Sequence, residues 1–250
     1  MTATASLGPG PTRYWRESQA PRYSLLFALP LFVGYEILTL AVSGGPGGEI
    51  RNGADVMLQS AFAELLGRRG PMVFEIGLIV LGLVLVGRDL HRHGRQLAAW
   101  IFFGMFVEAA VLALLCGLLV GSVTSHLFGT LGMVLGPVDR TPVPVRLMLS
   151  LGAGLYEELL FRVILVGTLA WAGRRVFGWS ATLSGIVAVV LGALLFSAVH
   201  YIGAYGDRLT LYSFVYRTLA GLFFSALYLT RGFGITAWTH ALYDIFVLVA

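Results

Sequence analysis

Lysine is absent from this chain of 250 residues, and cysteine occurs once. A single cysteine excludes an intrachain disulfide. Cys116 lies within an apolar run, where a thiolate is hard to form, so we expect it to pack rather than to act as a nucleophile. Charged residues make up only 12% of the sequence, against 57% hydrophobic residues. A soluble globule of this length would have too few polar side chains to cover its surface, so we expect lipid to surround most of the chain.

The basic excess is also small. Seventeen arginines against 13 acidic residues give a net charge of +4, which arginine-rich loops on one side of a membrane explain, so we expect no nucleic-acid partner. If the N-terminus is cytoplasmic, nine arginines fall on the cytoplasmic side and six on the other, which favours that orientation. With its all-arginine composition, the chain is expected in a bacterial inner (cytoplasmic) membrane.

Seven apolar segments approach the roughly 20 helical residues that cross a bilayer. They lie at residues 22–42, 71–87, 97–120, 143–171, 180–202, 209–230 and 234–250. Segment 51–66 has apolar residues at helical spacing, with Asp55, Gln59 and Glu64 off the apolar stripe, and is predicted to lie in the membrane interface. Segment 121–142, rich in Gly and Pro, is either a re-entrant piece or a short eighth helix. We therefore predict an all-α membrane bundle of about seven transmembrane helices (six to eight) plus an interfacial amphipathic helix.

The domain division follows from composition. Residues 1–21 form a polar N-terminal tail. The apolar run that follows is longer than a signal-peptide core and lacks a convincing cleavage site, so we expect an uncleaved first span. The second half is not repeated in the first, so residues 22–250 are predicted to form a single membrane domain.

Seven residues in the second half form three groups that interrupt the apolar pattern. They are Glu157, Glu158 and Arg162, then Phe196 and His200, then His240 and Asp244. A charged side chain at the centre of a membrane helix costs about 3 kcal/mol, so such a cluster predicts a functional site. By contrast, isolated acidic residues in the first three spans (Glu36, Glu75 and Glu108) are expected to be structural partners of Arg or Ser.

The spacing within each group suggests a role. Glu158 and Arg162 stand four residues apart with the acid first, as in a helical ion pair. Glu157 is rotated about 100° from Glu158 around the helix, which makes it the candidate base that activates water. His200 follows Phe196 by one turn, and Asp244 follows His240 by one turn.

Peptide hydrolysis needs a base, a group that orients water and donors that face the developing oxyanion. Glu157 with His200 supplies the first two, and His240 with a donor at Asp244 supplies the third. The H-E-x-x-H pattern of zinc proteases is absent, and metal-free hydrolysis is favoured. A divalent metal held by Glu157, His200 and His240 is the open alternative.

Straight helices would separate the two histidines. His200 falls about 30 Å along its span and His240 only about 9 Å into its own, at 1.5 Å per residue. A shared site therefore requires tilted helices, a short helix at 209–230 or a last helix that begins deep in the protein. We expect the two side chains to lie within about 12 Å of each other.

These residues resemble the CPBP family, the CAAX proteases and bacteriocin-processing enzymes that include the Ras-converting CAAX endopeptidase. The motifs EExxxR, FxxxH and HxxxN (or D) are matched by the sequences Glu157–Arg162, Phe196–His200 and His240–Asp244, within a family core at about 143–250. The resemblance implies an intramembrane glutamate protease with Glu157 as base, His200 on the catalytic water, and His240 and Asp244 at the oxyanion. Many members have Asn where this chain has Asp244, and an ionised Asp cannot donate a hydrogen bond. Either Asp244 is protonated or it orients His240.

The sequence thus predicts an intramembrane endopeptidase that uses glutamate-activated water to cut a membrane-anchored or lipidated protein near the bilayer surface. Two alternatives use the same residues. One is a non-catalytic peptide-binding or immunity protein of the same family. The other is a proton-coupled transporter, against which the missing internal repeat counts.

Overall fold

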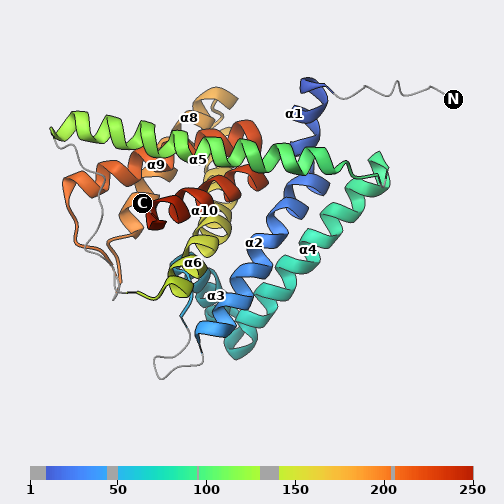
Figure 1. Cartoon of the computed structure of the whole chain (residues 1–250), viewed down its shortest axis with the longest axis horizontal. Helices are drawn as coiled ribbons and strands as arrows, with labels where there is room; N and C mark the ends of the chain where they lie inside the picture. Colours follow the sequence, from blue (N-terminus) through green and yellow to red (C-terminus); the bar gives the residue numbers. More distant parts are fainter. Residues whose placement is uncertain (1–9, 44–49, 95, 130–140, 204–205, 250) are drawn as a thin grey trace.

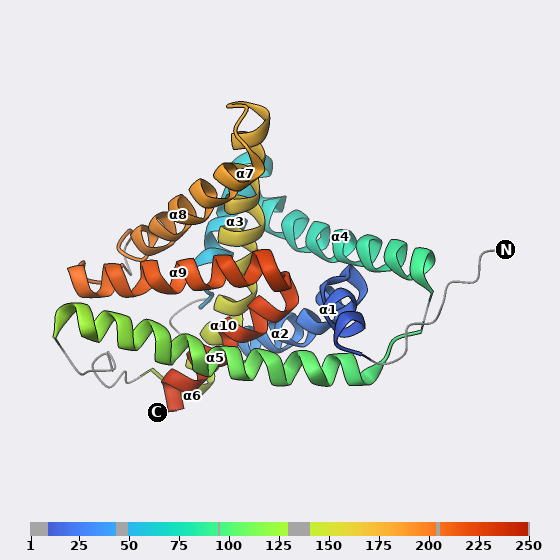
Figure 2. The same cartoon turned by 90° about the horizontal axis from the view of Figure 1, so that it is seen from above.

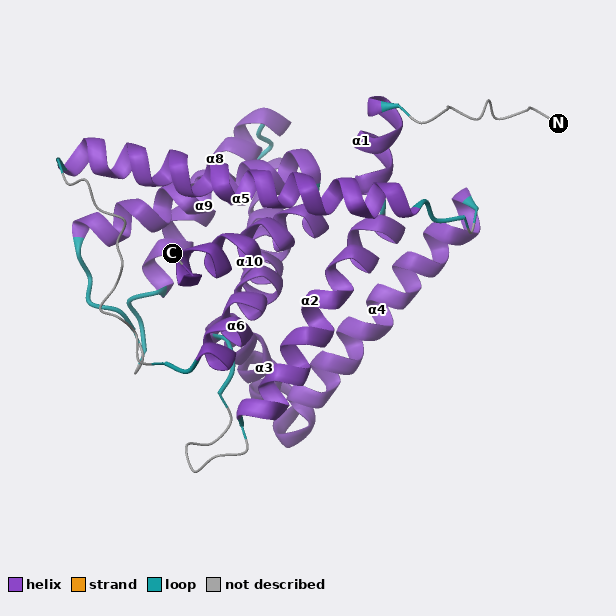
Figure 3. Ribbon diagram, in the orientation of Figure 1, coloured by secondary structure: helices purple, strands orange, loops and turns teal. Residues whose placement is uncertain are grey.

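The computed structural model describes residues 10–43, 50–94, 96–129, 141–203 and 206–249. These residues form helices and loops without any strand (Figure 3), which confirms the all-α prediction. The helices are α1 (Pro11–Gln19), α2 (Pro21–Val42), α3 (Gly53–Leu66), α4 (Gly70–His93), α5 (Ala99–Phe128), α6 (Val143–Gly152), α7 (Gly167–Arg175), α8 (Ala181–Val199), α9 (Leu211–Arg231) and α10 (Phe233–Val249). A 3₁₀ turn (Gly67–Arg69) joins α3 to α4, and two π-helical stretches, Ala153–Glu157 and Leu159–Val166, join α6 to α7.

Several helices are long and apolar enough to cross a membrane. Within the described part of the chain they are α2, the combined α3–α4 stretch, α5 and α8. Large apolar side chains such as Leu83 of α4 and Leu118 of α5 face outward, 68% and 66% exposed, as lipid-facing residues do. The chain is therefore built as a polytopic membrane protein.

Each of the seven predicted spans coincides with a helical stretch, but their limits differ from the prediction. Residues 143–175 form one helical stretch that contains both π-helical parts. Helix α5 continues to Phe128, so residues 121–128 are neither a re-entrant piece nor a separate helix. Residues 130–140 of that predicted segment lie outside the described residues.

Part of the polar N-terminal segment forms helix α1, which composition did not predict. Pro11 stands in its first turn, a position that suits proline because the missing N–H would have no helical partner there. Ser18 of α1 is buried and accepts a hydrogen bond from Arg231, at the end of α9. Arg231 also pairs with Glu108 of α5, at 2.5 Å, so Glu108 has the structural role expected of it. Residues 1–9 lie outside the described residues.

Helix α3 lies where an amphipathic helix was predicted, and one of its polar residues is buried. Asp55, placed off the apolar stripe, is completely buried, whereas Met57 and Leu65 of the stripe are exposed. Tyr35 donates a hydrogen bond to Asp55 from α2, and Arg51 forms an ion pair with it. These partners are distant in the sequence or lie outside the helix, so the apolar stripe alone could not reveal that Asp55 is buried.

Helix α10 occupies the centre of the bundle. It packs against α2, α5 and the first π-helical stretch (Figure 1). Helix α9 lies between α8 and α5 when the molecule is seen from above (Figure 2). A single residue, Gly232, separates α9 from α10, and its φ of 78° is a left-handed value that glycine adopts without strain. This tight turn brings the start of α10 into the core beside the helix that carries Glu157.

Candidate active site

The backbone that carries the first motif is not a regular α-helix. Ala153–Glu157 and Leu159–Val166 are π-helical, and Glu158 stands between them. A π-helical turn widens the helix, changes the direction of its side chains and is frequent at functional sites. The angle of about 100° expected between Glu157 and Glu158 therefore does not describe this stretch.

Glu158 is fully buried, with 0% exposure, and lies between Arg162 and His240. Its Oε2 is 3.2 Å from Nε of Arg162, four residues later, so the predicted ion pair is present by distance. Its Oε1 accepts a 2.6 Å hydrogen bond from Nδ1 of His240 on α10. Glu158 thus links the first motif to the third.

Arg162 is also buried, and much of its environment is aromatic. Its guanidinium carbon lies 4.5 Å from the ring centre of Phe196 and 5.5 Å from that of Phe224. Within the described residues its N–H groups meet no hydrogen-bond acceptor at good geometry, so Coulomb attraction to Glu158 and the two ring faces compensate its charge.

Phe196 of the second motif lies at the centre of the site. Its ring centre is 4.8 Å from that of His200 and 6.4 Å from that of His240. The two imidazoles that share this ring are consequently less than about 12 Å apart, as a shared site requires. The crossing of α8, α9 and α10 thus removes the separation that straight, parallel spans would impose.

His200 follows the last residue of α8 and is partly accessible. Its Nδ1 lies 2.7 Å from the carbonyl oxygen of Phe196, which can only accept, so Nδ1 carries the proton. In the neutral ring, Nε2 is therefore free to accept a hydrogen bond.

His240 has the opposite environment. It is 5% exposed and stacks on Phe224 of α9, with ring centres 4.4 Å apart and planes inclined by 18°. Its Nε2 lies 3.8 Å from Oδ2 of Asp244, which is beyond hydrogen-bond length. The ring thus has Glu158 on one side and Asp244 on the other, and these carboxylates compensate a positive charge on it.

Glu157 is partly accessible, unlike its neighbour Glu158. Its Oε1 accepts a 3.1 Å hydrogen bond from the side-chain amide of Asn52, in the loop before α3. Glu157 also interacts electrostatically with His240 and His200. The site therefore combines two sealed side chains, Glu158 and Arg162, with the nearly buried ring of His240 and three partly accessible side chains: Glu157, His200 and Asp244.

A glycine allows the first and third motifs to approach. A Cβ added to Gly154 would lie 2.4 Å from the carbonyl oxygen of Ala237 and 2.7 Å from Cβ of Ala241, both on α10. Real side chains do not approach so closely, so only glycine permits this contact. The backbone before Glu157 thus packs directly on the helix that carries His240.

The described side chains do not form a ready cluster of metal ligands. No group of three or more His, Cys, Asp or Glu side chains in the described residues is placed to hold a metal ion, and this includes the alternative ligand set of Glu157, His200 and His240.

Two residues at the site were missed by sequence reasoning. Phe224 covers both His240 and Arg162, and Asn52 holds Glu157. Phe224 is one of 16 phenylalanines in an apolar sequence, so nothing distinguished it. Asn52 follows Arg51 and precedes a helix, and that position indicated only an N-cap.

The fold and the site together define an integral membrane protein with a buried carboxylate–histidine centre. Residues 139–246 match the model of the family described as Type II CAAX prenyl endopeptidase, Rce1-like. These residues contain all three motifs, so the resemblance predicted from the motifs is confirmed. No curated protein and no solved structure matches the chain.

Proposed function

We propose that this protein is an intramembrane endopeptidase that hydrolyses a peptide bond in a membrane-associated or lipidated protein, with Glu157 activating the attacking water. One observation carries the proposal. The partly accessible carboxylate of Glu157 interacts electrostatically with two histidine rings from two other helical segments, and both rings lie against Phe196. The family, described as a prenyl endopeptidase family, supports the same class of reaction.

In the proposed mechanism, Nε2 of His200 accepts a hydrogen bond from the water and Glu157 takes a proton from it. The hydroxide adds to the carbonyl carbon of the peptide bond, and the carbonyl oxygen becomes an oxyanion. Collapse of this intermediate breaks the C–N bond, and Glu157 returns the proton to the leaving amine. Partial access of Glu157 and His200 is consistent with these roles.

The oxyanion is placed next to His240. The proton on Nδ1 of His240 is directed to Glu158, so only the doubly protonated ring has an N–H at Nε2 to donate to the oxyanion. Asp244 lies 3.8 Å from Nε2, and we assign it the role of orienting His240 electrostatically. Glu158 and Arg162 hold the ring in place and do not contact the substrate.

The substrate is expected to reach the site from the bilayer, because the site lies among helices whose outer surfaces are apolar. A lipid-anchored protein, prenylated or otherwise lipidated, meets this requirement. We place the enzyme in a bacterial inner membrane with a cytoplasmic N-terminus, from its arginine distribution.

The function is tested by comparing the membrane peptides of cells that carry the intact protein with those of cells that carry Glu157→Gln. Accumulation of a precursor in the variant cells, with loss of its cleaved form, is the expected result. Identical peptide profiles would contradict a protease. If the variant instead restores the phenotype of a deletion strain, the protein binds a peptide without cutting it. Solute flux in proteoliposomes that Glu157→Gln abolishes would indicate the transporter alternative.

A further inference from the structure

Asn52, in the part of the chain before the matched residues, contacts the proposed base directly. It precedes α3, is 5% exposed and donates a 3.1 Å hydrogen bond from Nδ2 to Oε1 of Glu157. The match to the family model begins at residue 139, so this contact joins the motif-bearing part of the chain to a segment outside the matched residues.

The orientation of the Asn52 amide is fixed by its other bonds. Its Oδ1 accepts the backbone N–H of Ala54 at 2.9 Å, as an N-cap of α3. Its carbonyl accepts the N–H of Val56 at 3.0 Å, and its own N–H donates to the hydroxyl of Tyr35 at 3.0 Å. Because the amide oxygen is already used on Ala54, the amide NH₂ must face Glu157.

The hydrogen bonds that hold Asn52 continue to the fully buried carboxylate of Asp55. The hydroxyl that receives the Asn52 N–H belongs to Tyr35, which donates in turn to Oδ2 of Asp55 at 2.8 Å. Arg51 and Gln59 bind the same carboxylate, at 2.8 and 2.9 Å. A buried polar network whose members are mutually bonded restrains each of them.

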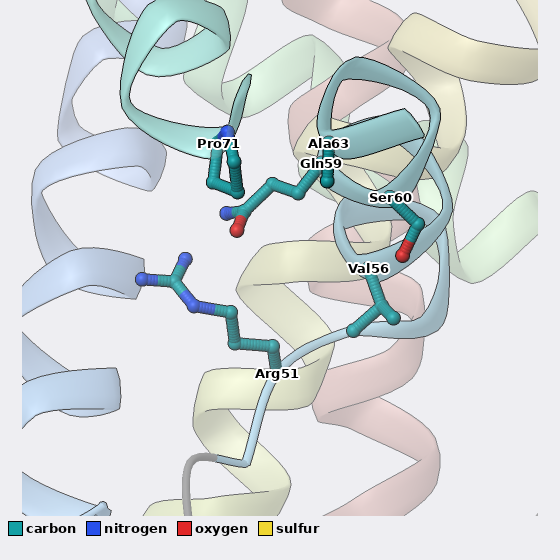
Figure 4. Close-up of a pocket in the computed structure, with 6 residues that line it drawn as sticks. All are labelled: Arg51, Val56, Gln59, Ser60, Ala63 and Pro71. Atoms are coloured by element: carbon teal, nitrogen blue, oxygen red, sulfur yellow. The ribbon is translucent and has the colours of Figure 1, made fainter. Parts of the chain in front are cut away.

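The far end of this network borders a pocket. Figure 4 shows Arg51 and Gln59 at its wall, between α3 and the start of α4. The other residues that line the pocket are Val56, Ser60, Ala63 and Pro71. The network therefore runs from the outer corner of α3 and α4 to the carboxylate of Glu157.

We infer that Asn52 is a positioning residue for Glu157. Its amide holds Oε1 and leaves Oε2 to face the water and the two histidines. A carboxylate that is held at one oxygen keeps one orientation towards its reaction partner. The orientation of Glu157 therefore depends on the amide N–H of Asn52. The first half of the chain thereby completes the site of the second half. The catalytic consequence rests on the function proposed above, whereas the hydrogen bond itself does not.

Three substitutions of Asn52 separate its hydrogen bond to Glu157 from its role as the N-cap of α3. Asn52→Ser keeps an oxygen for the N-cap but removes the amide that reaches Glu157. Asn52→Asp keeps the cap and places a second carboxylate against Glu157. Asn52→Gln keeps an amide donor. With a farnesylated CAAX reporter peptide in proteoliposomes, we expect kcat to fall about 10- to 100-fold for Ser and Asp, with KM nearly unchanged, and to recover partly for Gln.

Ser180→Ala is the matched control, because Ser180 caps α8 through Leu183 at an exposed position. It should lower the melting temperature without changing kcat. Wild-type kcat in Asn52→Ser, or a loss that follows the loss of folded protein, would overturn the inference.

A second measurement does not depend on catalysis. Melting temperatures of Asn52→Ser, Glu157→Ala and the double variant form a cycle, because each single substitution removes one partner of the hydrogen bond. If the two side chains interact, the double variant loses less than the sum of the single losses. Strict additivity would overturn the inference. If the wild-type protein cleaves no peptide but the losses in melting temperature are not additive, the proposed function fails. The contact between Asn52 and Glu157 would still stand.

Discussion

Glu158 and His240 are 82 residues apart in the sequence and are joined by a 2.6 Å hydrogen bond inside the membrane bundle. The bond is sealed from solvent, with Arg162 on the other oxygen of Glu158. The two histidines of the site are therefore not equivalent. His240 is part of a buried charged group, whereas His200 is partly accessible and bonded to a backbone carbonyl.

Substitution of the two histidines should separate activity from stability. Both His200→Ala and His240→Ala are expected to abolish hydrolysis. His240→Ala removes a partner of a buried carboxylate and should lower the free energy of unfolding by about 1.5–3 kcal/mol, whereas His200→Ala should cost about 1 kcal/mol or less. Thermal unfolding in detergent, measured beside turnover, checks this. Equal stability losses would contradict the buried pairing of His240.

The close contact at Gly154 predicts a steric variant. Gly154→Ala would place a Cβ 2.4 Å from the carbonyl oxygen of Ala237, so α10 must move. Overpacking of this kind costs about 1–3 kcal/mol. A displacement of His240 by about 1 Å can lower kcat about 100-fold. Turnover and melting temperature are both measured.

Gly82→Ala on α4 is the matched control, because its added Cβ would meet nothing within 4 Å. A helical Gly→Ala change in open space should stabilise slightly or have no effect. Equal behaviour of the two variants would show that the contact between Gly154 and α10 does not constrain the site.

The hydrogen bond from Tyr14 of α1 to Glu108 of α5 predicts that stability depends on pH. Tyr14, outside the membrane-spanning segments, donates a hydrogen bond to Glu108, and burial together with this bond raises the pKa of Tyr14 above its usual value of 10.0. A pKa that is higher in the folded state gives stability that is complete below the unfolded pKa and is lost as pH rises above it.

Melting temperatures between pH 8 and roughly pH 11 should therefore fall more steeply for the wild type than for Tyr14→Phe, which has no phenol to ionise near pH 10. Arg231 and Glu108 remain paired in the variant, so the comparison isolates Tyr14. Parallel curves would show that Tyr14 does not contribute.

The proposed metal-free mechanism predicts that chelators do not change the rate of hydrolysis. Purified enzyme treated with EDTA or 1,10-phenanthroline and then dialysed should keep its full rate on the reporter peptide. Loss of activity that added zinc restores would contradict glutamate-activated hydrolysis without a metal, and would revive Glu157, His200 and His240 as ligands.

The helical fold could be predicted because lipid imposes long apolar segments, and these are visible in the sequence. The exceptions depend on tertiary partners. Asp55 was placed on the polar side of α3, yet it is buried because Tyr35 and Arg51 come to it from outside that helix. Helix α1 forms in a polar segment because Arg231, more than 200 residues later, holds Ser18.

The motifs predicted which residues of the second half come together, but not how they are oriented. Regular helical geometry could not reveal the π-helical turns on either side of Glu158. Nor could it reveal Asn52, whose bond to Glu157 spans 105 residues of sequence. The roles assigned to Glu157, His200, His240 and Asp244 stay predictions until variants are measured.

The role of Glu157 is tested most directly by the turnover of purified Glu157→Gln beside that of the wild type, on membrane-anchored reporter peptides that include a farnesylated CAAX peptide. The substitution keeps the size of the side chain and removes the base. We predict that the variant folds with a similar melting temperature and cleaves no peptide that the wild type cleaves. Full turnover by the folded variant would contradict the assignment of Glu157 as the group that activates water.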